Sequence, residues 1–506
     1  MKILPVKKIR EADSYTILNE PITDIDLMER AATECFYWFI ANIPHHRKIL
    51  IFCGPGNNGG DGFATGRMLL QKGYQVEAFL AGTIDKLSPS CSINYRRFLD
   101  TSGSKFKLLQ EGNIFPEIGH DDVVVDALFG SGLTRPVDGF MAKIISEINH
   151  CGALVVAIDV PSGLLCDETS IRTGIPVIIK ADHTLTFSPP KLALFFPEND
   201  PFLGDWKLLD IGIMQEFIDS AKVRNIYLDR QEVVPILRAR NKFAHKGLFG
   251  HAFLLCGSKG KLGAAVLAAK ACLRSGPGLV TVGIPKTGIQ ILQSSVPEAM
   301  LSIGSDEDYL AEIPDLTPYT SIAVGPGIGM NHLTATSLKI LIQSTHQPII
   351  FDADAINLLG ENKTWLAFIP QGSIFTPHPK EFERLVGKCS NHFERNQMQR
   401  EFSFKYHCYV ILKGAYTAIT TPEGLCYFNS TGNPGMATGG SGDVLTGILA
   451  GIKAQGYSSL ESCLIGVYIH GLAGDLALST FGFEALIAGD IIENLGKAFK
   501  STYGKL

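Results

Sequence analysis

The chain contains two glycine-rich segments that each stand between a strand-like run and a helix-like run. The first, GPGNNGGDG at 54–62, follows the apolar run KILIFC at 48–53. Glycine lets backbone approach a ligand closely, and the free amides at a helix start favour anions. The spacing GxGxxG alone is a weak dinucleotide signature, and the acidic residue about 20 positions on falls inside the next predicted strand rather than at its end. This segment is therefore only weak support for a hydride-transferring dehydrogenase.

Side chains with oxygen atoms follow the ends of three predicted strands. Asn58 and Asp61 lie in the first loop, Asp126 ends the run DVVVD, and Ser162 follows the run ALVVAIDVP. Parallel strands end at the same edge of a sheet, and oxygen ligands suit a hard cation, with a monovalent ion conceivable. Turn and capping chemistry explains each residue singly. Their joint occurrence favours a site.

The second glycine segment, NPGMATGGSG at 433–442, precedes the helical run VLTGILAGIKAQ at 444–455. Its free amides and the positive end of the helix dipole predict an anion site. Asp443 stands in the first turn, where it predicts a base held beside a phosphoryl group. The alternative for Asp443 is a simple helix cap. The P-loop pattern GxxxxGK[ST] is not matched.

Alternating strands and helices must position both loops. Short apolar runs bounded by glycine turns predict two α/β domains with parallel sheets and ligands at the strand carboxyl ends. A chain of 506 residues also exceeds the usual limit of about 250–300 residues for one core. The charged stretch without glycine turns between the halves predicts domains 1–220 and 235–506 joined by a linker at 221–234.

Composition excludes several classes of protein. Hydrophobic residues make up 45%, charged residues 19%, and the net charge is −5, so we expect a globular protein without a nucleic-acid partner. The eleven cysteines form no CxxC pair, which argues against structural zinc and fits a reducing compartment. The positively charged start MKILPVKKIREAD is not followed by the apolar segment of a signal peptide. No apolar run approaches the roughly 18 residues that span a bilayer. We therefore expect a cytoplasmic protein without a membrane partner.

The first half resembles the YjeF N-terminal domain family, the NAD(P)H-hydrate epimerases. The resemblance covers about residues 1–215 and rests on LMERAA, GPGNNGGDGFATGR, DALFGSGLTRPV, AIDVPSGL and ADHTLTFSPPKLAL, with Ala32 standing where the family commonly has Gly. It implies a Rossmann-like three-layer α/β/α sandwich. It implies a potassium ion held by Asn58, Asp126 and Ser162. It implies substrate contacts from Asn57, Asn58, Gly59, Gly60, Asp61, Gly130, Ser131, Gly132, Leu133, Thr134, Arg135, Pro136 and Asp159.

Epimerisation at the hydrated ring carbon needs proton transfer and a stabilised open or iminium-like intermediate. Asp159 is the expected acid/base. Lys191 has two interpretations, a positive charge at the site or a solvated surface lysine.

The second half resembles the YjeF C-terminal family, the NAD(P)H-hydrate dehydratases, within the ribokinase-like superfamily. The resemblance covers about residues 235–500, from HKGLFG through VGPGIG, DADAIN, TPHPKEFERL and LKGAYTAIT to NPGMATGGSGDVLTGILAG. It implies a ribokinase-like α/β/α domain. It implies that hydrated cofactor is bound by Ala264, Gly327, His378 and Asp443. It implies that the nucleotide lies against Lys413, Gly414, Ala415, Tyr416, Thr417 and Gly442.

Two simpler explanations remain open in this half. His378 is also explained as a turn histidine between two prolines, and Lys413 as an ordinary lysine at a strand end. Magnesium is expected with the nucleotide, without assigned ligands, and the fusion order favours ADP over ATP.

Together the resemblances imply a bifunctional isomerase and lyase for metabolite repair. One domain interconverts R and S NAD(P)HX, and the other, with Asp443 as its base, dehydrates the S form to NAD(P)H while ADP yields AMP and phosphate. The expected partners are NADHX, NADPHX and ADP, and the family implies a homo-oligomer. The alternative is a ribokinase-like small-molecule kinase fused to a dinucleotide-binding domain. A non-catalytic domain would have lost motif residues, and none is lost in either half.

Overall fold

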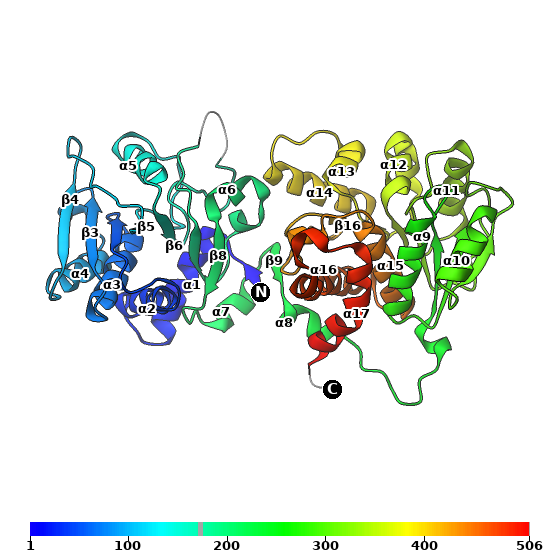
Figure 1. Ribbon diagram of the computed structural model, residues 1–506, viewed down its shortest axis with the longest axis horizontal. Helices are drawn as coiled ribbons and strands as arrows, with labels where there is room; N and C mark the ends of the chain where they lie inside the picture. Colours follow the sequence, from blue (N-terminus) through cyan, green and yellow to red (C-terminus); the bar gives the residue numbers. More distant parts are fainter. Residues whose placement is uncertain (171–175, 505–506) are drawn as a thin grey trace. The chain divides into compact units, whose positions relative to one another are not determined.

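The computed structural model describes residues 1–170 and 176–504 and divides the chain into two compact units, Lys2–Val223 and Arg224–Leu506 (Figure 1). The prediction of a linker at 221–234 is wrong for most of that stretch. Strand β9 (Asn225–Leu228) pairs in parallel with β18 (Cys426–Asn429), and the short helix α8 (Arg230–Val233) follows it. The charged residues that suggested a linker flank Leu228 and Val233, which are fully buried in the core of the second unit.

The first unit is built on a seven-stranded parallel sheet in the order β4-β3-β2-β5-β6-β7-β8. Its strands are β2 (Ile49–Cys53), β3 (Val76–Ala81), β4 (Lys105–Leu109), β5 (Val123–Ala127), β6 (Leu154–Ile158), β7 (His183–Phe187) and β8 (Asp205–Leu209), and the two-residue strand β1 (Lys2–Ile3) precedes them. The strand order reverses between β2 and β5. In open α/β sheets the crevice outside such a reversal is where ligands bind.

Helices cover both faces of this sheet (Figure 1). The helices are α1 (Val6–Asn19), α2 (Asp24–Asn42), α3 (Asn57–Gln71), α4 (Pro89–Leu99), α5 (Gly139–His150), α6 (Asp200–Leu203) and α7 (Gln215–Ser220). Alternate residues of β2 face opposite sides: Ile49 and Ile51 pack with α2, α3 and α4, whereas Leu50 and Phe52 pack with α5. The predicted three-layer α/β/α sandwich is confirmed.

The second unit contains a larger mixed sheet. Within Arg224–Leu506 the strand order is β9-β18-β17-β16-β15-β14-β13-β10-β11-β12, with antiparallel pairing only at β16-β17 and β17-β18. The remaining strands are β10 (His251–Leu255), β11 (Leu279–Ile284), β12 (Met300–Ile303), β13 (Ser321–Val324), β14 (Ile349–Phe351), β15 (Ile374–Phe375), β16 (Tyr409–Leu412) and β17 (Ala418–Thr420). Here the order reverses between β10 and β13.

Two helical layers enclose this sheet as well. One contains α9 (Leu262–Arg274), α15 (Ser441–Ala454), α16 (Ser459–Ala485) and α17 (Ala488–Tyr503), and the other contains α11 (His332–Ser344), α12 (Ala353–Glu361), α13 (Pro379–Val386) and α14 (His392–Tyr406), while α10 (Ile289–Ser295) follows β11. Helix α15 contacts both β10 and β13, the two strands between which the order reverses. The predicted α/β architecture is confirmed in this half too, with antiparallel pairs at β16-β17 and β17-β18 added to the parallel strands.

One helix departs from the expectation that no apolar run is long enough to span a bilayer. Among the described residues, α16 alone meets that criterion by length and composition, with 56% of its apolar window buried. It packs against α15 and α17, and Gly482 (φ +73°) interrupts its helical geometry. Core helices of folded domains meet the same criterion, because they too are apolar around most of their circumference.

Candidate active sites

The first glycine loop becomes a helix earlier than its sequence suggests. Helix α3 begins at Asn57, so the motif from Asn57 to Gly62 forms its first turns rather than a loop. A Cβ on Gly54 would lie 1.9 Å from the carbonyl oxygen of Leu128, and one on Gly59 would lie 1.9 Å from that of Gly54. These distances leave no room for a side chain at Gly54 or Gly59. The two glycines therefore allow the start of α3 to pack closely against the ends of β2 and β5.

Asn58, at the start of α3, has a buried amide without hydrogen-bond partners in the part of the chain that the structure describes. Its side chain is buried, yet neither atom of its amide has a hydrogen-bond partner among the described residues. Burying a polar group without a partner costs roughly 1–3 kcal/mol. Such an orphaned amide is typical of a position that a ligand completes.

Asp126 and Ser162 form one buried network at the ends of β5 and β6. The hydroxyl of Ser162 donates to Asp126 Oδ1 at 2.6 Å, and its backbone N–H donates to Oδ2 at 2.7 Å. Burial raises the pKa of Asp126 to about 6, although the bonds from Ser162 oppose the shift. Phe129 N–H donates to Ser162 Oγ at 2.8 Å, which ties the following glycine loop to this pair.

Gly130 connects this network to Asn58 and Asp159. A Cβ on Gly130 would lie 3.1 Å from Asp159 Oδ2 and 3.3 Å from Asn58 Oδ1. The structure thus brings together all three residues predicted to bind potassium, and it places the predicted acid/base beside them.

Asp159 is held in a strained and strongly charged setting. Its φ is +65°, a region that non-glycine residues rarely occupy and that clusters at functional sites. Its Oδ1 lies 2.6 Å from Nζ of Lys191, and its Oδ2 accepts the N–H of Ser131 at 2.9 Å. Burial alone would raise the pKa of Asp159, but the charge of Lys191 and these hydrogen bonds lower it below the ordinary value.

The interpretation of Lys191 as a solvated surface lysine is wrong. Its side chain is 2% exposed, and its ammonium group donates to the carbonyl oxygen of Phe187 at 2.6 Å. Lys191 lies four residues after β7, and sequence could not reveal its burial because the surrounding Pro-rich turn resembles a surface loop.

Two further acids share this environment. Burial and the charge of Asp159 raise the pKa of Asp61 well above its usual range. Burial raises the pKa of Asp13 on α1 to about 6, with Lys191 opposing the shift and Asp159 adding to it. Asp61 was predicted, whereas Asp13 was missed, since it belongs to an ordinary amphipathic helix.

Other predicted substrate contacts are less closely assembled. Ser88 Oγ donates to Asn57 Oδ1 at 2.6 Å, and the Arg10 guanidinium donates to the carbonyl oxygen of Gly132 at 3.2 Å. The four residues that follow Gly132 lie in a largely exposed loop; they are Leu133, Thr134, Arg135 and Pro136. Gly59 and Gly60 are buried inside α3. Substrate binding by these residues stays a prediction.

In the second unit, Asp443 lies in the first turn of α15. Gly440, immediately before the helix, has φ +91°, which lets the chain enter the helix through a left-handed residue. Burial and the charge of Asp352 raise the pKa of Asp443 to about 6, with Lys413 opposing the shift. The carboxylate is therefore poised to take up a proton near neutral pH.

Lys413 follows β16 and reaches the start of the same helix. A Cβ on Gly442 would lie 3.3 Å from Lys413 Nζ. The ammonium group is 2.9 Å from Asp352 Oδ1 and 4.0 Å from Glu381 Oε2. The simpler interpretation of Lys413 as an ordinary strand-end lysine is not supported, because its charge lies among three acids at the helix start.

Asp352 was missed as a site residue, although it lies in the quoted segment DADAIN. It follows β14 directly, it is 1% exposed, and Thr446 of α15 donates to its Oδ2 at 2.7 Å. An acid immediately after a predicted parallel strand was the signal that could have identified it.

The residues predicted to contact hydrated cofactor lie at neighbouring strand ends. Gly327, with φ +65°, would bring a Cβ within 3.0 Å of Ala264 Cβ, so these two positions touch. His378 begins α13 as its N-cap: its Nδ1 accepts the N–H groups of Lys380 at 3.1 Å and Glu381 at 3.3 Å. These bonds agree with the interpretation of His378 as a turn histidine. Its contact with hydrated cofactor stays a prediction.

The predicted nucleotide loop after Lys413 forms a closed turn. Thr417 Oγ1 donates to the carbonyl oxygen of Gly414 at 3.0 Å, which encloses Ala415 and Tyr416. Nucleotide binding here remains a prediction.

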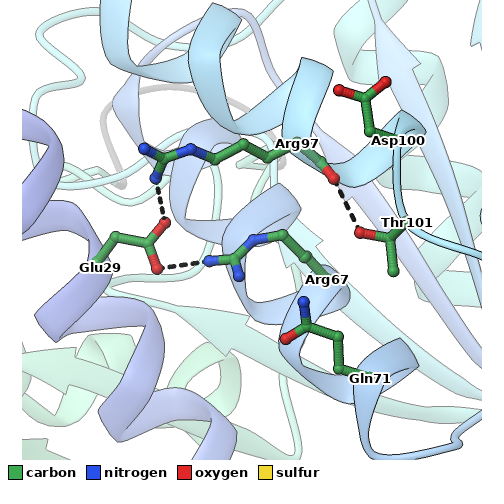
Figure 2. Close-up of a pocket in the computed structure, with 6 residues that line it drawn as sticks. All are labelled: Glu29, Arg67, Gln71, Arg97, Asp100 and Thr101. Carbon is green, nitrogen blue, oxygen red and sulfur yellow. Dashed lines mark hydrogen bonds and ion pairs between the residues drawn. The ribbon is translucent and has the colours of Figure 1, made fainter.

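A shallow surface pocket lies on the first unit. Its volume is about 350 Å³, and it is lined by Glu29, Arg67, Gln71, Arg97, Asp100 and Thr101 (Figure 2). Glu29 accepts ion-pair contacts from Arg67 at 2.5 Å and from Arg97 at 2.8 Å. Because Glu29 engages both guanidinium groups and Asp100 adds a further acid, the pocket has no excess positive charge. None of the predicted site residues lines it.

Within residues 1–170 and 176–504, no group of three or more His, Cys, Asp and Glu side chains is arranged to hold a metal ion. Amide, hydroxyl and carbonyl oxygens, such as those of Asn58, Ser162 and Phe129, do not belong to these four side-chain types.

Comparisons with known proteins match both halves. Residues 24–193 match the family described as YjeF-related protein N-terminus, and residues 252–497 match the family described as NAD(P)H-hydrate dehydratase. The bifunctional NAD(P)H-hydrate repair enzyme Nnr of Moorella thermoacetica is 34% identical, covering 98% of this chain and 96% of its own length. That of Coxiella burnetii is also 34% identical, covering 97% of each chain.

A solved structure covers the second half alone. The ADP/ATP-dependent NAD(P)H-hydrate dehydratase of Bacillus subtilis, co-crystallized with ATP/Mg²⁺, is 29% identical and covers 55% of this chain and 98% of its own, with a TM-score of 0.48.

Proposed function

The chain belongs to the family of bifunctional NAD(P)H-hydrate repair enzymes, and on this premise we propose that it restores hydrated NADH and NADPH in two steps. The first unit interconverts the R and S hydrates. The second unit dehydrates the S hydrate to NAD(P)H while ADP is converted to AMP and phosphate. The observation that carries the proposal is the pair of separate clusters, each with a buried acid and a buried or half-buried lysine beside a glycine-rich helix start.

In the dehydratase unit, Asp443 accepts the proton of the ring hydroxyl. The hydroxyl oxygen then attacks the terminal phosphorus of ADP, and the bond from that phosphorus to the bridging oxygen breaks to release AMP. Amides at the start of α15 and the ammonium group of Lys413 stabilise the charge on the transferring phosphoryl group. The lone pair of the ring nitrogen expels phosphate, and loss of a proton from the adjacent carbon completes the ring double bond.

Magnesium supplies charge neutralisation for the nucleotide phosphates when it is bound. The second cluster fits it only in part, because Asp352 already engages Lys413 and Thr446. We propose that magnesium is held mainly by phosphate oxygens and water, as is common for this ion. Glu381, 4.0 Å from Lys413 Nζ, is the nearby carboxylate that would hold it, since Asp443 serves as the base.

In the epimerase unit, Asp159 is ionised at neutral pH, because Lys191 holds its pKa low. It is therefore suited to accept the proton of the ring hydroxyl while the bond from that carbon to the ring nitrogen breaks, which gives an open aldehyde. The nitrogen takes up that proton, and the reverse steps close the ring on the other face of the aldehyde. Lys191 keeps this carboxylate charged in a buried place. The strained backbone at Asp159 fixes the direction of the carboxylate beside Gly130 and Ser131.

Potassium fits the cluster around Asn58. The amide of Asn58 is buried and unpartnered, and oxygen atoms of Asp126, Ser162 and Phe129 belong to the adjoining network. An ion there would contribute a fixed positive charge for the phosphates of the substrate. We propose Asn58, Asp126 and Ser162 as its ligands.

Two further proposals concern the protein as a whole. We propose that it works in the cytoplasm, because all eleven cysteines are free thiols, as is typical of a reducing compartment. We also propose that the chain forms a homo-oligomer, which light scattering on the purified protein would test.

The proposal is tested with a mixture of R and S NADPH hydrates, supplied with ADP or ATP and magnesium. Recovery of reduced-nicotinamide absorbance is followed for wild type and for Asp443→Asn. Full nucleotide-dependent recovery by wild type alone supports both activities. Recovery that stops at the S fraction contradicts the epimerase assignment. No recovery with either nucleotide contradicts the dehydratase assignment and favours the kinase alternative.

A further inference from the structure

Both carboxylate oxygens of Asp352 accept hydrogen bonds in the second cluster. Its carboxylate is buried, Lys413 Nζ donates to Oδ1 at 2.9 Å, and Thr446 Oγ1 donates to Oδ2 at 2.7 Å. These partners lie just after β16 and within α15, which are both separated in sequence from β14. Asp352 therefore joins three elements at one point.

The backbone at this position is unusual. Asp352 occupies the N-cap position of α12, where an acid commonly accepts a helix N–H, but its side chain makes no such capping bond. The next residue, Ala353, has φ +46°, a conformation that a non-glycine residue adopts at a cost. The Asp352 carboxylate therefore binds Lys413 and Thr446 instead of capping α12, and the backbone at the next residue is strained.

The partners of Asp352 define the start of α15. Thr446 lies three residues after Asp443, so both side chains share one face of that helix. Lys413 Nζ lies beside Gly442, whose amide belongs to the predicted anion site. Glu381 Oε2 is 4.0 Å from the same ammonium group and offers a competing position for it.

We propose that Asp352 is a positioning residue of the dehydratase site: it fixes the Lys413 ammonium group beside the amides of α15 and holds the helix face that carries Asp443. The inference rests on the proposed function, in which a nucleotide phosphate occupies that place. Without Asp352, Lys413 is free to pair with Glu381 or Asp443 instead.

A simple electrostatic role makes the opposite prediction. If Asp352 acted only as a negative charge near a phosphate, its removal would tighten nucleotide binding. A positioning role predicts that binding weakens, because the cation moves away from the phosphate. The direction of the change therefore separates the two explanations.

The experiment uses the full-length chain carrying Asp352→Asn, Thr446→Val or Thr446→Ser. Asp315→Asn serves as a matched control, since Asp315 bonds only its own turn at Thr317 among the described residues. Nucleotide affinity is measured by calorimetry with magnesium and ADP or ATP, and steady-state kinetics with the S hydrate gives KM and kcat. Thermal melting of each variant reports whether it is folded.

We expect Asp352→Asn to weaken nucleotide binding and raise the nucleotide KM by at least about tenfold, the range of a lost bond to a charged group. The KM for the hydrate should change much less. Thr446→Val should weaken nucleotide binding by roughly threefold or more, and Thr446→Ser, which keeps the hydroxyl, should restore it. Asp315→Asn should match wild type.

Unchanged or tighter nucleotide binding in folded Asp352→Asn would overturn the inference, as would equal behaviour of the Val and Ser variants at 446. Failure of the proposed function is a different result. In that case wild type binds nucleotide without releasing NAD(P)H, and the binding data still decide the role of Asp352.

Discussion

The two units build their clusters from the same parts and use the lysine in opposite ways. In the first unit Lys191 pairs directly with Asp159, the proposed acid/base, at 2.6 Å. In the second unit Lys413 pairs with Asp352 at 2.9 Å, and no described residue hydrogen-bonds the carboxylate of Asp443. The pKa of Asp159 is consequently lowered, whereas the pKa of Asp443 is raised to about 6.

This difference shows that the partner of the lysine, and not burial alone, decides what a buried acid can do. Burial is the largest influence on both acids and raises the pKa of each. A neighbouring cation reverses the direction only at Asp159. An acid kept ionised can accept a proton down to low pH, whereas an acid that titrates near neutrality is the stronger base but loses that ability as pH falls.

The largest effect is expected from Asp443→Asn. Dehydratase kcat should fall by about 10³-fold, within the range of lost general base catalysis, because an amide cannot accept the hydroxyl proton. Epimerisation of the R and S hydrates by the same preparation should remain at the wild-type rate, measured by chromatographic separation of the epimers. Equal losses in both activities would contradict the separation of the two sites.

Replacement of Lys191 by Met should affect the other unit. Burial would then dominate and raise the pKa of Asp159, so the carboxylate would lose its charge and epimerase activity should fall about 100-fold. Removing one partner of a buried ion pair should also lower the free energy of unfolding by about 3–5 kcal/mol. The exposed Lys222→Met is the control, and normal epimerase activity in the Lys191 variant would contradict the role assigned to the pair.

The two activities should depend differently on pH. Dehydratase kcat should fall as pH decreases through about 6, because Asp443 then becomes protonated, and should be about tenfold lower near pH 5. Epimerase activity should persist to lower pH, since the pKa of Asp159 lies below its ordinary value. Both profiles are measured on one preparation after checking that it stays folded. Coincident acid limbs would contradict the comparison.

The smallest effect concerns stability. The carboxyl of Asp443 has an ordinary pKa of 3.8 in the unfolded chain and about 6 in the folded protein, so its ionisation favours unfolding as pH rises through this interval. Asp443→Asn removes that cost and should raise the free energy of unfolding by about 1–2 kcal/mol at about pH 7.5, with little gain at about pH 4. Denaturant titration at both pH values measures it, and a variant less stable than wild type at the higher pH would count against the raised pKa.

Several features of the second cluster follow from local sequence. Gly439 to Gly442 before an apolar helix predicts the anion site, and Asp443 lies in the first turn as expected. The signal is local because helix starts expose amides whatever the rest of the fold does. A different pattern identified Asn58, Asp126 and Ser162: they follow predicted parallel strands, whose carboxyl ends lie at one edge of a sheet.

The sequence by itself therefore determined the two α/β units, their glycine-rich helix starts and the family, because these depend on short-range patterns of apolar residues and glycines. Only the tertiary structure decided which acid each lysine pairs with. Lys413 and Asp352 are 61 positions apart, and Thr446 and Asp352 are 94 apart. Such contacts, and the burial of Lys191 behind a surface-like turn, arise from the packing of distant elements. The direction of each pKa shift depends on that packing, so it cannot be predicted from residue types and spacing.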